Sequence, residues 1–288
     1  MTFGIRPPSF RLPESTHVGA VHLQVSDLAR SLAWYRTVLG FPVLAEDGES
    51  AVLGAGRPLV HLHLRPGARP VPRRGAYGLF HFAILLPHRP ALGAFVSHLA
   101  EQDVRAGMAD HAVSEALYLW DPDNLGIEVY ADRPRHTWQR RGDELVMTTD
   151  PLDVPDLMRA AESTRWQGMP EGTTIGHMHL HVGDLDTARA FYHAALGLDV
   201  TVWHYPGALF FSAGGYHHHL GTNTWSPGPA AAEDEARLLH WELVLPDEDS
   251  VLQAGKSLKA AGYDAQRLPR GIAIADPWGT VLQLRPRA

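Results

Sequence analysis

The chain has 288 residues, no cysteine and a formal net charge of −7 at pH 7, which is enough length for two domains with separate cores. The acidic balance argues against a general nucleic-acid binder and against a protein that binds anionic membranes. The lack of cysteine excludes disulfides and thiolate ligands, and a reducing cytosol is the default, so we expect a cytoplasmic protein. No apolar run approaches the roughly 20 residues that span a bilayer.

Residues 1–17 are expected to form an extended, proline-rich arm, because they lack the charged and apolar pattern of a signal peptide. Beyond the arm, one unit recurs along the chain. It starts at Ala20 as AVHLQVSDLARSLAWYRTVLGF and at His177 as HMHLHVGDLDTARAFYHAALGL, and less literal copies start at His81 and His240. Each copy has an alternating strand, a turn and a helix, and short strands follow. The repeat predicts an α+β fold of four βαβββ units.

The second unit contains the most informative segment, Asp110 to Tyr130, with the sequence DHAVSEALYLWDPDNLGIEVY. Its histidine, tyrosine and glutamate stand in strand, turn, strand order. His111 and Tyr118 can therefore face a substrate from one strand, while Glu128 presents a carboxylate from the next. The segment predicts a polar site on one face of the sheet.

Residues 133–174 are expected to connect the second and third units, with a short helix in DVPDLMRAAEST. We accordingly expect one domain at 18–132 that holds the first two units and another at 175–288 that holds the last two. A connector of this length also permits a crossover in which non-sequential units pair.

In the third unit, strand alternation separates the histidines from the apolar residues. One face carries His177, His179 and His181, and the other, which should pack under the helix of the unit, carries Met178, Leu180 and Val182. Strand histidines are more often hydrogen-bonded or surface residues than ligands, and we expect this of His179 and His181. His177 differs because it falls at the same repeat position as His81 and His240, a position that Ala20 holds in the first unit.

The four units and the segment from Asp110 to Tyr130 resemble the vicinal oxygen chelate superfamily of extradiol dioxygenases, glyoxalases and bleomycin- or fosfomycin-resistance proteins. The segment follows the extradiol signature of a histidine, a tyrosine, an Asp-Pro turn and a glutamate. Ala109 and Asn124 stand where the signature usually has glycine-type residues. The resemblance implies two incomplete barrels, with a metal on the concave face held by two histidines and one carboxylate.

Pairing the units tests which of them can supply such a triad. The first and second units lack a ligand at Ala20, and the third and fourth have Gln283 in place of the carboxylate. The second and third units supply a complete set, so the metal ligands are expected to be His81, His177 and Glu128. The first and fourth units would then form a degenerate barrel, in which His61, His63 and His240 are structural or vestigial.

The resemblance also implies roles for the remaining polar residues. His111 and Tyr118 would contact the substrate, and the run YHHHLG from Tyr216 resembles the family pattern that places the acid/base role on His218. Strand parity counted from the following leucine would turn His218 towards the helix. A bulge or loop is therefore required there, and His217 is the alternative.

These residues favour an extradiol dioxygenase of the catechol 2,3-dioxygenase type, which uses Fe(II), or in its place Mn(II), to cleave an aromatic diol with O2. We also expect a homo-oligomer without nucleic-acid or membrane partners. The first alternative is a glyoxalase-like, metal-dependent lyase or isomerase, and the second is a non-catalytic protein that binds an aromatic drug. Tyr118 and the acid/base histidine favour the dioxygenase over the first alternative, and the second has no need for a complete metal triad.

Overall fold

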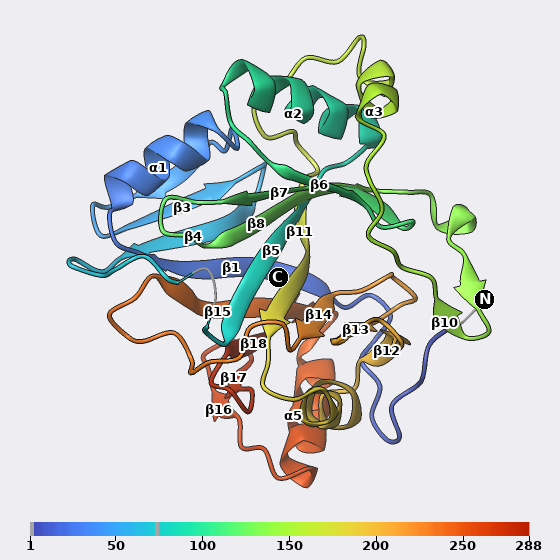
Figure 1. The fold of residues 1–288 in the computed structure, drawn as a ribbon. Helices are drawn as coiled ribbons and strands as arrows, with labels where there is room; N and C mark the ends of the chain where they lie inside the picture. The colour runs from blue at the N-terminus through green and yellow to red at the C-terminus, as the bar shows by residue number, and fades with distance from the viewer. Residues whose placement is uncertain (1–2, 73–74, 288) are drawn as a thin grey trace.

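The computed structural model describes residues 3–72 and 75–287 and contains the four expected units (Figure 1). The first unit comprises β1 (His17–Val25), α1 (Leu28–Thr37), β2 (Val43–Glu46), β3 (Ser50–Gly54) and β4 (Pro58–Leu64). The second comprises β5 (Gly78–Leu85), α2 (Arg89–Glu101), β6 (Gly107–Asp110), β7 (Ser114–Trp120) and β8 (Gly126–Asp132). The predicted α+β fold of repeated βαβββ units is confirmed in this half of the chain.

The second half repeats the plan. The third unit comprises β11 (Thr174–His181), α4 (Leu185–Ala188), β12 (Asp199–Val202), β13 (Ala208–Ser212) and β14 (Leu220–Asn223). Its helix continues beyond α4 in π-helical form over Arg189–Ala195. The fourth unit comprises β15 (Arg237–Leu245), α5 (Glu248–Ala260), β16 (Gln266–Arg267), β17 (Ile272–Ala275) and β18 (Val281–Pro286).

The helices of all four units begin at the same position of the repeat. There a polar side chain accepts a hydrogen bond from the backbone N–H three residues on, at Asp27, His88, Asp184 and Asp247. Such a bond satisfies one of the free N–H groups in the first turn of a helix. The turn residue that occupies the same repeat position in all four units is therefore the helix N-cap. Because the cap fixes where each helix begins, the strand residue seven positions before it also occupies the same place in each unit.

The strands form two eight-stranded sheets that join non-sequential units. The first sheet has the order β12-β13-β14-β11-β5-β8-β7-β6 and joins the third unit to the second, and the other has the order β16-β17-β18-β15-β1-β4-β3-β2. At the centre of each sheet, the first strands of the two units pair antiparallel, as β11 with β5 and β15 with β1. The sheets thus follow the crossover arrangement that the connector permits.

Buried hydrogen bonds link the units that are consecutive in the chain. The Tyr35 hydroxyl on α1 donates to Asp121 in the second unit at 3.2 Å, and the Tyr192 hydroxyl donates to Asp276 in the fourth at 2.7 Å. Burial raises the pKa of Asp121 to about 7. Sheet pairing and these bonds join the units in different combinations, so the division into domains at 18–132 and 175–288 stays a prediction.

Strand β11 shows how the alternating pattern is used. Met178, Leu180 and Val182 are fully buried in the main hydrophobic core. That core also contains Phe191 from the π-helical segment of the same unit. The histidines of the strand point to the opposite face, as expected from period 2, and two of them line a cavity on the concave side of the sheet.

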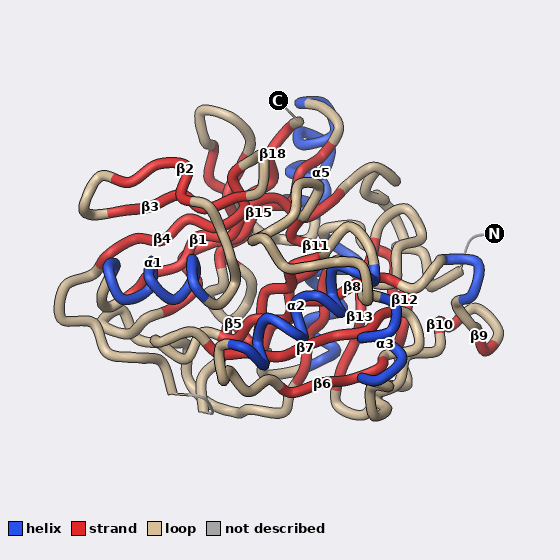
Figure 2. The backbone as a smooth tube through the Cα atoms, turned by 90° about the horizontal axis from the view of Figure 1, so that it is seen from above, coloured by secondary structure: helices blue, strands red, loops and turns tan. Residues whose placement is uncertain are grey.

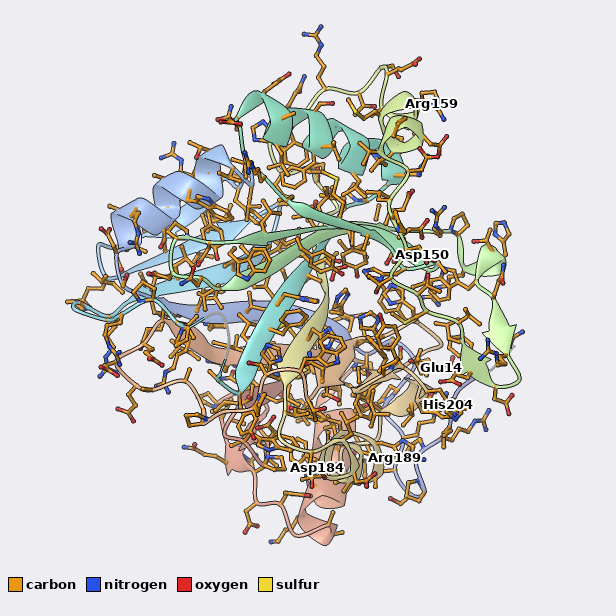
Figure 3. All side chains as sticks on the ribbon, viewed as in Figure 1. Glu14, Asp150, Arg159, Asp184, Arg189 and His204 are labelled. Carbon is orange, nitrogen blue, oxygen red and sulfur yellow. The ribbon has the colours of Figure 1, made fainter. Side chains whose placement is uncertain are left out.

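The connector and the arm both lie against the first sheet. The connector contains a 3₁₀ turn (Arg135–Thr137), β9 (Arg140–Arg141), β10 (Glu144–Leu145) and α3 (Val154–Ala160), so the expected helix is present. The backbone of Asp150, which Figure 3 labels, pairs with that of Asp110 on β6. In the arm, Ile5 pairs with Val200, and the N–H of Gly4 donates to the carbonyl of Asp143, between the paired strands β9 and β10 (Figure 2). None of the helices in the described segments has the length and apolarity for a membrane span.

Candidate metal centre

Three neighbouring strands of the first sheet, β11, β5 and β8, bring His177, His81 and Glu128 together. Nε2 of His81 lies 3.0 Å from Oε2 of Glu128, and Nε2 of His177 lies 3.2 Å from the same oxygen. One potential ligand atom from each residue lies within 4.8 Å of the other two, and all three side chains are buried. These are the residues that the pairing of the second and third units predicts as ligands.

The donor set fits a divalent metal. His81 faces the Glu128 oxygen, yet neither of its buried ring nitrogens makes a hydrogen bond of proper geometry, and Nδ1 of His177 also has no partner. Buried polar atoms without a partner are uncommon in folded proteins. Two imidazoles and one carboxylate with open positions form the facial triad that non-haem Fe(II) oxygenases use. A shared ion would satisfy Nε2 of His81, the nitrogen that faces the carboxylate and that the protein itself leaves without a partner.

The electrostatics of the three residues also suit a metal. Burial lowers the pKa of His81 and of His177, so both rings are neutral at pH 7 and can donate a lone pair. Burial acting alone would raise the pKa of Glu128, but the two histidines beside it hold that pKa well below its usual range. Since the rings are neutral, we ascribe this effect chiefly to the hydrogen bond from Nε2 of His177, 3.2 Å from the carboxylate oxygen, and not to attraction by cations.

His111 and Tyr118 form a hydrogen-bonded pair on the wall of the same cavity. Nδ1 of His111 lies 2.6 Å from the Thr148 carbonyl oxygen, and Nε2 lies 2.6 Å from the Tyr118 hydroxyl. A carbonyl only accepts, so Nδ1–H donates to it, and in the neutral ring Nε2 accepts from the tyrosine. Burial and the nearby Glu128 carboxylate raise the pKa of Tyr118 well above 10. The phenol is therefore a protonated hydrogen-bonding group.

The YHHHLG run forms a loop that ends where β14 begins at Leu220, so the irregular backbone that His218 requires is present. His218 lines the cavity, with its ring centroid 4.1 Å from that of His177. His217 is fully buried behind it, and its Nε2 lies 2.9 Å from Oδ1 of Asp132. Of the two candidates for the acid/base role, His218 is the one on the cavity wall.

A chain of hydrogen bonds sets the tautomer of His218. The Asp132 carboxylate only accepts, so Nε2–H of His217 donates to it, and in the neutral ring Nδ1 of His217 is an acceptor. Nδ1 of His218 lies 2.7 Å from that atom and donates to it. Nε2 of His218 then carries a free lone pair. Burial lowers the pKa of His218 well below 6.5, which keeps the ring neutral.

The cavity has a volume of about 340 Å³, and all six predicted site residues line it. Sequence reasoning missed several further wall residues, which include His179 and Phe80 as well as Met147, Thr148 and Thr149 of the connector. Phe210 and Trp225 also line it, whereas Trp203 does not. His181 is hydrogen-bonded to Asn223 at 2.6 Å, as expected of a strand histidine. No local sequence signal marks the connector residues, because their position follows from how the connector folds back.

The second sheet carries no equivalent triad among the described residues. His22, His61 and His240 stack there with ring centroids 3.9 and 4.1 Å apart, nearly parallel to one another. Because the rings are stacked in parallel, their nitrogen atoms do not point towards one common position, as the ligands of a metal ion must. The stack is consistent with a degenerate half-barrel of the first and fourth units.

Comparison with known proteins accounts for this architecture. The family model described as the Glyoxalase/Bleomycin resistance protein/Dioxygenase superfamily matches residues 16–129 and 174–284. The chain belongs to this superfamily. A relative named Catechol-2,3-dioxygenase, from Bacillus subtilis (strain 168), is 45% identical over 271 residues, which cover 92% of this chain and 95% of that protein.

Two solved structures show the same fold at low sequence identity. A candidate dioxygenase from Bacillus subtilis subsp. subtilis str. 168 aligns with a TM-score of 0.68 and 13% identity, over 96% of this chain and 86% of that one. Glyoxalase I from Zea mays aligns with a TM-score of 0.57 and 17% identity, over 94% and 92%. At these identities the two likenesses concern the superfamily fold alone.

Proposed function

We propose that this superfamily member is a metal-dependent extradiol dioxygenase that cleaves the ring of a catechol-type diol with O2. The observation that carries the proposal is the one cavity in which His81, His177 and Glu128 meet His111, Tyr118 and His218. The 45% identity to a protein named catechol-2,3-dioxygenase over most of both chains supports the same reaction class. We further propose Fe(II) as the metal, with Mn(II) as the second candidate, because both suit this donor set.

Each residue has a role that follows from its contacts. His81, His177 and Glu128 would hold the metal, which when bound supplies Lewis acidity towards the diol oxygens and a position for O2. Nε2 of His218 has the free lone pair to accept a proton from the second hydroxyl of the diol and to return it later to an oxygen atom derived from O2 as the O–O bond breaks. His217 and Asp132 act behind it as positioning residues that keep this tautomer.

On the other wall, the Tyr118 hydroxyl donates to His111, so its oxygen keeps lone pairs for a hydroxyl of the diol. The Thr148 carbonyl fixes the orientation of the His111 ring. The remaining wall is aromatic and aliphatic, with Phe80, Phe210 and Trp225, and it can pack against the ring of the substrate. The cavity therefore combines polar groups at one end with an apolar surface at the other.

The test is oxygen uptake by Fe(II)-loaded protein with catechol under single- and multiple-turnover conditions. We expect one O2 to be consumed per catechol and a yellow ring-opened semialdehyde to appear. Protein with one equivalent of metal that consumes no O2 across a panel of catechols, yet turns over a hemithioacetal, would refute the proposal in favour of a glyoxalase-like reaction. We also expect a homo-oligomer, which sedimentation velocity at micromolar concentration would test.

A further inference from the structure

Strand β5 contains a bulge beside the metal centre. In its pairing with β11, His81 lies opposite His179 but Leu79 lies opposite Leu180, which leaves Phe80 as an extra residue on β5. A bulge of this kind turns a side chain away from the alternation of the strand. The ring of Phe80 accordingly lies among the histidines of the concave face.

The position of this ring is set by its surroundings on three strands. Its centroid lies 4.8 Å from the ring of His81, 5.2 Å from that of His179 and 4.8 Å from that of His181. The neighbouring strand β8 has a glycine where the bulged backbone approaches, because a Cβ at Gly126 would lie 1.9 Å from the Phe80 carbonyl oxygen. The bulge and the glycine together hold the aromatic ring at the edge of the metal cavity.

Phe80 is also part of the wall of a second cavity. This adjoining cavity, of about 380 Å³, lies between the two sheets and is lined by residues that include Tyr77, Trp120, Trp278 and Arg237. Phe80 lines both spaces. The metal cavity by itself, at about 340 Å³, lies near the lower end of the roughly 300–1,000 Å³ typical of ligand sites. The aromatic ring therefore belongs to the wall that the two spaces share.

The chemistry of the adjoining cavity suits an anionic, planar group. Arg237 forms no ion pair with a carboxylate within 3–72 or 75–287, and its Nε is buried without a hydrogen-bond partner. A guanidinium beside aromatic walls can bind a carboxylate while an aryl group stacks on the rings. An extension of the substrate that passed the position of Phe80 would meet these groups.

We propose that Phe80 is a specificity-determining residue that restricts the site to catechols with small substituents, by closing the metal cavity off from the cavity that contains Arg237. The inference rests on the proposed ring-cleaving function and deepens it by naming the substrate class. Removal of the ring would join the two spaces and admit catechols that carry an arylcarboxylate arm.

The experiment compares kcat/KM for catechol and for a catechol with a benzoate arm in wild type, Phe80→Ala and a matched control, Phe210→Ala. Phe210 lines only the metal cavity, so its removal enlarges that cavity without opening the other. For Phe80→Ala we expect the ratio of kcat/KM for the extended over the simple substrate to rise at least about 10-fold, within the range expected for a change in pocket size. An equal rise in Phe210→Ala, or wild type that already prefers the extended substrate, would overturn the proposal.

A double variant tests the role of the cation. In Phe80→Ala, the additional Arg237→Gln substitution should abolish the preference for the benzoate arm over its neutral amide, while the amide is still accepted. An unchanged preference would refute an anion-binding role for Arg237.

Anaerobic calorimetry on the metal-loaded protein separates this proposal from the proposed function. Phe80→Ala should bind the extended catechol at least about 10-fold more tightly than wild type does, whether or not O2 is consumed. If the wild type binds catechol but never consumes O2, the dioxygenase proposal fails while the role of Phe80 is still decided by the affinities. Equal affinity of wild type and Phe80→Ala for the extended catechol would refute the proposed role of Phe80.

Discussion

The Glu128→Gln substitution isolates the carboxylate of the candidate metal centre, since it changes one oxygen to an amide without altering the length of the side chain. In the wild type a single oxygen lies 3.0 and 3.2 Å from the two histidine nitrogens. A metal that binds only the folded chain stabilises it by about 2.7 kcal/mol at a free concentration of 100 Kd. At roughly 2–4 °C per kcal/mol for large domains, this predicts a rise in Tm of about 5–10 °C.

The assay is thermal unfolding of the apo protein under anaerobic conditions, with and without Mn(II) or Fe(II), combined with metal analysis after gel filtration. Wild type should bind one equivalent and show the full shift, while Glu128→Gln should bind none and shift by less than about 1 °C. The matched control is Glu242→Gln, because Glu242 lies on the concave face of the second sheet, where no triad is found among the described residues. It should behave like the wild type.

The opposite pattern would refute the reasoning. If Glu128→Gln keeps one equivalent of metal and the full rise in Tm, the carboxylate is not a ligand. Loss of metal in Glu242→Gln with retention in Glu128→Gln would move the site to the sheet of the first and fourth units.

Three further outcomes are expected. His218→Gln should lower kcat for ring cleavage by about 10²–10⁴-fold with unchanged metal content. His217→Gln should lower kcat by less, because it removes only a hydrogen bond that positions His218. If stopped-flow kinetics show the larger loss in His217→Gln, the base is His217. Burial depresses the pKa of His22 to about 2 and of His240 to about 4, so the unfolded chain takes up more protons below pH 6.5. The free energy of unfolding in urea should therefore fall by roughly 1 kcal/mol per pH unit for His22, and by less for the partly exposed His240, as the pH drops below 6, and His240→Gln should lessen that slope. Gly126→Ala should lower Tm by several degrees, because its Cβ would meet a backbone carbonyl of β5 at 1.9 Å; an unchanged Tm would contradict the close approach of β8 to that bulge.

Much of the fold was predictable because each unit has the same local sequence patterns. Period 2 in the strands and the helix-capping side chains, such as Asp27 and Asp184, recur in each unit. The same alternation assigned the histidines of β11 to the concave face and the apolar residues to the core. The expected ligands were selected by asking which two units together offer a complete donor set, and the sheet that joins β5 to β11 brings those residues into contact.

Other parts of the site could not be predicted from local patterns. The bulge at Phe80 depends on the register between two strands about 100 residues apart in sequence, and it overrides the alternation that would place this ring on the other face. His217 was a competing candidate until its bond to Asp132 placed it behind His218. Met147 to Thr149 reach the cavity only because the connector folds back against the first sheet.

The sequence by itself determined the four units, the face on which each strand presents its histidines, and the residue types available for a metal, because these follow from periods of 2 and 3.6 residues along the chain. Only the tertiary structure decided which nitrogen of His218 is free, that Phe80 lines both cavities, and how the connector reaches the site. These depend on hydrogen bonds and packing between residues that are distant in the chain, and no periodicity within one segment contains that information.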